Sequence, residues 1–180
     1  FGLRGYLLIS TFQFHPRVLD SWLNERWPTI DAAFESLDSV ADRNIHVSIP
    51  VSVNGRIVRM PEATDFREEF LKPVASLILV ADDGMGKTSL AIQLARWAMA
   101  ESVQDRMANH RIVPILIEND FENVKVLDLD SLILRIQHAL QSICGCVEIP
   151  QTDLVKHLLR TKRMLVIFDN VTDASLGITS

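Results

Sequence analysis

Residues 77–88 read LILVADDGMGKT, an apolar run followed by a short loop with two glycines that ends in Lys-Thr. Residues 89–99, which follow, have the apolar spacing of a helix. A loop of the form Gly-x4-Gly-Lys-Ser/Thr between a buried strand and a helix holds phosphate groups. Ala81 stands where the first glycine of that form would be, and Gly86, Lys87 and Thr88 supply the rest. The stretch predicts an α/β fold with a phosphate site where strand 77–81 meets the helix.

The residue types of the loop match the chemistry of a nucleotide site. Glycines let backbone N–H groups curl around an anion, and the helix N-terminus directs its positive dipole end toward the same place. Lys87 would reach the β- and γ-phosphates, and the Thr88 hydroxyl would bind Mg²⁺. Asp82 and Asp83 bring negative charge into the loop, and we expect them to point away or to cap the turn. The predicted cofactor-binding residues are Asp83, Gly84, Met85, Gly86, Lys87, Thr88 and Ser89.

A second motif lies about 80 residues further on, where residues 165–169 read LVIFD. Ligands of open α/β sheets bind outside the C-terminal ends of the strands, so Asp169 is predicted to emerge beside Lys87 and to hold Mg²⁺, directly or through water. Many nucleotide hydrolases place an acid directly after this aspartate, but here the next residue is Asn170. Asp173 is the acidic alternative, which makes Asp169 and Asp173 the candidate catalytic residues.

The periodicity of the chain predicts two regions, residues 1–60 and 61–180. The first would hold a helix over 17–43, bent at Pro28, and a β-hairpin within 46–59 that turns at Asn54-Gly55. The second alternates helices and strands, which calls for a mainly parallel sheet with right-handed crossovers. Together with the phosphate loop, this order resembles the three-layer sandwich of a P-loop NTPase. Its expected helices are 62–71, 89–99, 129–142 and 153–160, and its expected strands are 77–81, 112–117 and 164–168.

Composition excludes several classes of function. The 180 residues are 48% hydrophobic and 23% charged, as in ordinary globular proteins. A formal net charge of −5 argues against nonspecific nucleic-acid binding, which needs a basic surface. No run of eighteen apolar residues exists, so we expect no membrane span within this chain. The two cysteines, Cys144 and Cys146, are predicted to be free thiols in a reducing cytoplasm.

Residues 81–91 and 168–173 together resemble the NACHT group of STAND signalling NTPases, particularly large bacterial members. In that family the loop typically reads Gly-x-Gly-Gly-x-Gly-Lys-Thr-Ser/Thr-Leu, and the Walker B strand ends Asp-Gly-x-Asp/Ser/Thr-Glu. Matched by position, Asp169 is the metal-associated aspartate, Asn170 replaces glycine, and Asp173 replaces the distal acid.

The resemblance implies a cytoplasmic switch that binds ATP or ADP with Mg²⁺. ADP would hold a closed monomer, and ATP would couple to opening and self-association after a trigger is sensed. Hydrolysis would then be a slow reset. The resemblance also implies that these residues are the nucleotide-binding core of a longer protein, so that hydrolysis by this chain alone would be weak or absent.

Two other functions use the same loop. A scaffold could grip nucleotide without turnover, which Ala81 and Asn170 favour. A P-loop kinase acting on a small molecule would need a carboxylate after the second strand, where Glu118 and Asp120 are the candidates.

Overall fold

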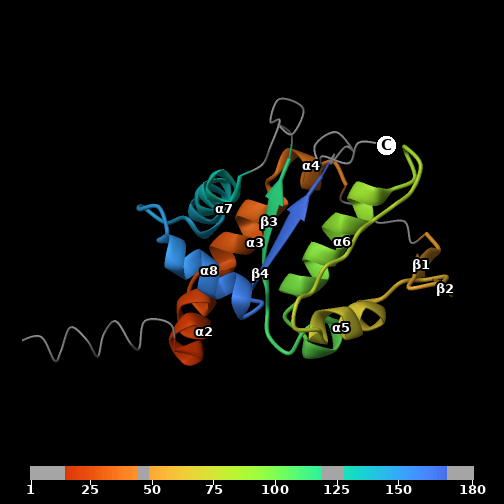
Figure 1. Cartoon of the computed structure of the whole chain (residues 1–180), viewed down its shortest axis with the longest axis horizontal. Helices are drawn as coiled ribbons and strands as arrows, with labels where there is room; N and C mark the ends of the chain where they lie inside the picture. The colour runs from red at the N-terminus through yellow and green to blue at the C-terminus, as the bar shows by residue number, and fades with distance from the viewer. Residues whose placement is uncertain (1–14, 44–48, 119–127, 170–180) are drawn as a thin grey trace, which may run out of the picture.

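The computed structural model describes residues 15–43, 49–118 and 128–169. Helices dominate this part of the chain, with two short pairs of strands among them (Figure 1). In order, the elements are α2 (Pro16–Asn24), α3 (Trp27–Glu35), α4 (Asp38–Ala41), β1 (Val51–Val53), β2 (Arg56–Val58), α5 (Ala63–Leu71), α6 (Lys87–Met99), the 3-10 turn η1 (Val103–Asp105), β3 (Val113–Ile117), α7 (Leu129–Cys144), α8 (Thr152–Arg160) and β4 (Met164–Phe168).

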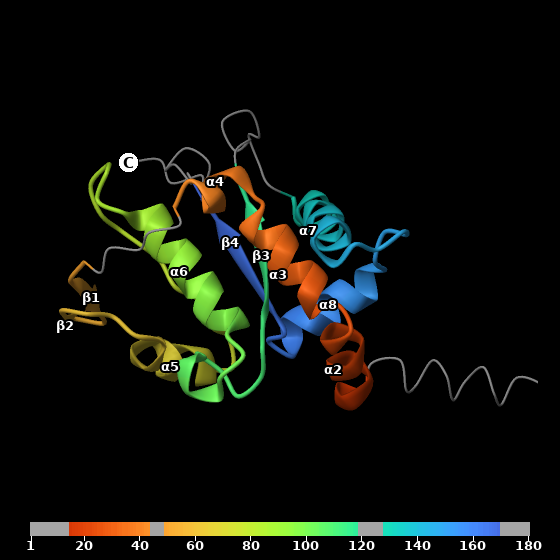
Figure 2. The same cartoon turned by 180° about the vertical axis from the view of Figure 1, so that it is seen from behind.

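Strands β3 and β4 form a parallel pair at the centre of the molecule. Their register runs from Val113 opposite Met164 to Ile117 opposite Phe168. Helix α6 lies to one side of this pair and helices α7 and α8 to the other in both views (Figures 1 and 2). Because β3 is buried along most of its length, its sequence is almost continuously apolar, as expected for a strand covered on both faces. The parallel pairing predicted for these two segments is confirmed, while the complete three-layer sandwich remains a prediction.

The prediction of a strand over residues 77–81 is wrong, because the structure has no hydrogen-bonded strand there. Residues 75–80 do alternate in burial, with Leu77 and Leu79 half-buried and Ile78 and Val80 exposed. They belong to no sheet among the described residues. Alternation follows from local sequence, but a strand also requires a neighbour that pairs with its N–H and C=O groups, and apolar composition alone does not supply one.

The helix predicted over 17–43 is instead three helices. The chain leaves helical hydrogen bonding after Asn24 and again after Glu35. Pro28 lies in the first turn of α3, where a backbone N–H would have no acceptor within the helix, so that proline costs no hydrogen bond. The proline therefore starts a helix here, and the predicted bend within one continuous helix is wrong.

Helices α2, α3 and α4 share their hydrophobic cluster with the parallel strands. Trp27 and Phe34 are buried together with Ile115 of β3 and Leu140 of α7. The predicted division of the chain near residue 60 remains a prediction, but these N-terminal helices do not pack as a separate cluster.

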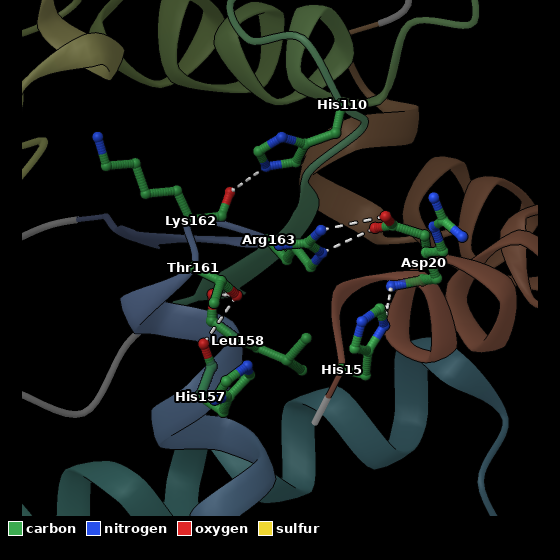
Figure 3. Close-up of polar contacts among 9 residues, drawn as sticks. His15, Asp20, His110, His157, Leu158, Thr161, Lys162 and Arg163 are labelled. Atoms are coloured by element: carbon green, nitrogen blue, oxygen red, sulfur yellow. Dashed lines mark hydrogen bonds and ion pairs between the residues drawn. The ribbon is translucent and has the colours of Figure 1, made fainter. Parts of the chain in front are cut away.

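A polar junction also fixes α2 to the start of β4 (Figure 3). Arg163, itself buried, donates two hydrogen bonds to the carboxylate of Asp20, at 2.8 and 3.1 Å. The preceding residue, Lys162, has a left-handed backbone with φ of +56°. Its carbonyl accepts a hydrogen bond from His110 Nε2 at 3.0 Å, and its ammonium donates to the carbonyl of Phe70 at 2.9 Å. The α8–β4 turn thus joins segments that are far apart in sequence.

The predicted turn of the β-hairpin at Asn54-Gly55 is confirmed. Strands β1 and β2 pair antiparallel, and Asn54 and Gly55 both have positive φ, +50° and +81°. Positive φ at both central residues is the requirement of the type I′ turn that Asn-Gly favours. The Asn54 amide also donates to the carboxylate of Glu69, which ties the hairpin to α5.

The other predicted elements are α5 through α8 with β3 and β4, and each of them begins and ends within about two residues of its predicted bounds. Among the helices that the structure describes, none combines the length and apolar character needed to cross a membrane.

Candidate functional site

The glycine loop has the backbone that its sequence predicts. Gly84 and Gly86 have φ values of +78° and +82°, in the left-handed region that residues with a Cβ rarely adopt. Helix α6 begins directly afterwards at Lys87, and the first turn contains no acidic residue. Leu90 N–H donates to the Gly86 carbonyl at 2.9 Å, so the N–H groups before it are those that a helix start leaves without an intrahelical acceptor. This arrangement suits an anion.

Thr88 and Asp169 meet, although they are 81 residues apart in sequence. The Thr88 Oγ1 atom lies 2.9 Å from Asp169 Oδ2 and 3.1 Å from Oδ1, and both residues are half-buried. Thr88 is held by the first turn of α6 and Asp169 by the end of β4, where its N–H donates to the Ile117 carbonyl at 3.2 Å. The structure thus brings together the two residues predicted to bind Mg²⁺.

Lys87 is turned onto its own loop. Its Nζ atom lies 2.8 Å from the Ala81 carbonyl oxygen, 3.0 Å from the Asp82 carbonyl oxygen and 3.4 Å from Asp83 Oδ1. The lysine side chain is about one-third exposed, at 34%, and the Asp83 side chain is fully exposed. Asp83 was expected to point away or to cap the turn; its side chain is fully exposed, and its carboxylate lies within ion-pair distance of Lys87.

One contact of the loop was not predicted from the sequence. A Cβ atom built on Gly86 would lie 3.2 Å from Ile49 Cδ1, which is tighter than ordinary van der Waals contact. A Cβ atom on Gly84 would have no neighbour within 4 Å. The half-buried side chain of Ile49, just before β1, therefore packs beside the loop at Gly86. The apolar alternation of this region predicted a hairpin and carried no signal for this contact.

The donor set formed by Thr88 and Asp169 fits Mg²⁺. This ion takes one or two protein oxygen ligands and completes its octahedron with phosphate oxygens and water. Within residues 15–43, 49–118 and 128–169, no group of three or more His, Cys, Asp or Glu side chains is placed to hold a metal ion. A tightly caged metal of the zinc type is thus not built into the part of the chain that the structure describes.

Other candidate residues lie at the same edge of the sheet or outside the described residues. Glu118 is exposed and follows Ile117, whose partner in β4 is Phe168, so Glu118 and Asp169 extend from paired positions. Asp120, Asn170 and Asp173 lie outside the described residues.

Comparisons of the chain with family models, with curated proteins and with solved structures found no match. Any assignment of function must therefore rest on the chemistry of the loop, of Thr88 and of Asp169.

Proposed function

We propose that the chain binds ATP or ADP with Mg²⁺, as the nucleotide-binding domain of a NACHT-type signalling NTPase. The observation that carries the proposal is the hydrogen-bonding contact between Thr88 and Asp169 beside a loop with left-handed Gly84 and Gly86. A hydroxyl from a helix start and a carboxylate from a strand end, both next to an anion-binding loop, form a place for the metal of a metal–nucleotide complex.

Each residue of the site has a role in this proposal. The N–H groups of residues 83–89 would surround the phosphates, and the Lys87 ammonium would bind the terminal ones. Thr88 and Asp169 would hold Mg²⁺, which when bound offsets phosphate charge. Asp173 would polarise the attacking water, a role that comes from the resemblance of residues 168–173 alone. We expect hydrolysis by this chain to be weak or absent, because the resemblance implies that an arginine acting on the transition state comes from another part of such proteins.

The switch part of the proposal concerns the longer protein of which this domain would be a part. A nucleotide can shift a conformational equilibrium only by binding one state better than the other. ADP would favour a closed monomer, and ATP would favour an open form that self-associates in the cytoplasm.

A second candidate function is phosphoryl transfer to a small acceptor. The position of Glu118 at the same sheet edge as Asp169 favours it, because an acceptor-activating carboxylate must lie close to the phosphates. A nucleotide-binding scaffold without turnover would share the binding residues and lack either reaction.

Isothermal titration calorimetry with ATP and with ADP, with and without Mg²⁺, tests the proposal directly. We expect micromolar binding that Lys87→Ala weakens by about 10- to 100-fold, because hydrogen bonds to charged groups contribute about 1.5–3 kcal/mol. Lys156→Ala is the matched control, since it removes the same charge from an exposed position on α8. Equal affinities in Lys87→Ala and Lys156→Ala would refute the phosphate site.

The reaction is tested separately by phosphate release and by labelling of small-molecule acceptors. An ADP preference without turnover favours the switch. Transfer to an added acceptor that Glu118→Gln abolishes would favour the kinase instead.

A further inference from the structure

The Lys87 ammonium has as many acceptors in its own loop as it has protons to donate. An ammonium group carries three N–H donors. Its three neighbours are the carbonyl oxygens of Ala81 and Asp82 and the carboxylate oxygen of Asp83. A phosphate oxygen that binds Lys87 must therefore take the place of one of them.

The acceptor that is easiest to displace is Asp83. Its distance to Nζ is the longest of the three, 3.4 Å against 2.8 and 3.0 Å for the carbonyls. Its side chain is fully exposed, so the carboxylate can rotate into water without leaving a buried charge unpaired. The two carbonyls belong to the backbone of the loop, so they part from Nζ only if the loop changes conformation or the lysine side chain itself moves.

We propose that Asp83 is an internal competitor for the phosphate position on Lys87, and that it lowers the affinity of the loop for nucleotide. This inference rests on the proposed nucleotide-binding function. Asp83 acts as a specificity residue, because a ligand must offer Lys87 a better acceptor than one exposed carboxylate. The phosphate chain of a nucleotide, carrying several charges, does so more readily than a singly charged anion.

The size of the effect follows from exposure. Ion pairs between exposed side chains contribute little to stability, and the corresponding change in affinity is about 1.5- to 5-fold. Asp83 therefore tunes nucleotide affinity and does not abolish it.

The neighbouring aspartate offers a matched control. Asp82 is exposed like Asp83 and carries the same charge in the same loop, but it reaches Lys87 through its backbone carbonyl. Asp82→Ala and Asp83→Ala both reduce general repulsion of phosphate, whereas only Asp83→Ala removes an acceptor from Lys87. The difference between the two variants isolates the competition.

The first measurement is the affinity for Mg²⁺-ATP and Mg²⁺-ADP of the unchanged protein and of both variants. We expect Asp83→Ala to bind about 1.5- to 5-fold more tightly than Asp82→Ala.

The second measurement needs no nucleotide. Trace acetylation with acetic anhydride, read by mass spectrometry, reports how available the Lys87 amine is, with exposed Lys156 as the internal reference. We expect Asp83→Ala to raise acetylation of Lys87 relative to Lys156 and Asp82→Ala to leave that ratio unchanged.

The outcomes separate the two proposals. Equal affinity and equal labelling in the two variants, with nucleotide still bound, would overturn the competition and leave nucleotide binding standing. Absence of nucleotide binding in the unchanged protein and in both variants would overturn both. Tighter binding and higher labelling in Asp83→Ala alone would support the competition.

Discussion

Alanine substitutions at the two loop glycines should differ in their cost, because only one of them meets a neighbour. Gly84 and Gly86 have nearly the same left-handed backbone, with φ of +78° and +82°. A Cβ atom added at Gly84 would have open space within 4 Å, while one added at Gly86 would lie 3.2 Å from Ile49 Cδ1.

The magnitudes follow from these two geometries. Holding a residue with a Cβ in the left-handed region costs about 1–2 kcal/mol, which both variants share. Crowding adds about 1 kcal/mol at Gly86, the low end of the range for overpacking, because half-buried Ile49 can shift by a few tenths of an ångström. We expect losses in the free energy of unfolding of about 1–2 kcal/mol for Gly84→Ala and about 2–3 kcal/mol for Gly86→Ala.

Urea unfolding of the two variants measures the difference, and Ile49→Val supplies the test of its cause. Valine lacks the Cδ1 atom that approaches Gly86, so the extra loss should disappear when Gly86→Ala is made in the Ile49→Val background. The coupling energy of this double-mutant cycle is expected to be about 1 kcal/mol. Equal losses for Gly84→Ala and Gly86→Ala, or a coupling energy near zero, would refute the argument that Ile49 confines the loop.

Two further predictions concern titratable groups. Hydrogen bonds from the Lys72 ammonium and then from the Asn54 amide lower the pKa of Glu69 below its ordinary value of 4.5. The ionised Glu69 carboxylate therefore stabilises the fold fully above pH 4.5, and this contribution to the free energy of unfolding is lost as the pH falls through the lowered pKa. Glu69→Gln should flatten that acid decline in urea midpoints, and an unchanged profile would contradict it. Burial, followed by the charge of Cys146, raises the pKa of the Cys144 thiol to about 12, so iodoacetamide at pH 8 should label Cys146 in the native protein and Cys144 only after unfolding. Equal native labelling of both thiols would show that Cys144 is more accessible than its burial implies.

The meeting of Thr88 and Asp169 was predictable from the sequence because it follows from general rules of α/β sheets. A strand that ends in Asp169 delivers its carboxylate to one edge, and the loop before α6 was expected at that same edge. The Asn54-Gly55 turn was predictable for a similar reason, since its conformation depends on the two residues themselves.

Elements that depend on distant partners were less predictable. Residues 75–80 have the burial alternation of a strand, but no paired neighbour among the described residues makes them one. Apolar residues within 17–43 keep a helical spacing although the helix is broken twice. All three helices pack on the same core, so the spacing of their buried residues does not reveal the short turns between them.

Side-chain contacts within the site were the least predictable part. The approach of Ile49 to Gly86 joins residues that are far apart in the sequence, and no local pattern records it. The orientation of Asp83 toward Lys87 depends on the path of the loop backbone between them, which the residue types do not specify.

The contact of Arg163 with Asp20 spans 143 residues, nearly the whole described chain. A ribosome that adds about 5–20 residues per second needs roughly 7–30 s to make the second partner after the first. During that interval, the helices and strands that cover the apolar side chains of α2 and α3 in the finished molecule are added one after another. The cover over α2 and α3 is therefore complete only when Met164, at the start of β4, has been added.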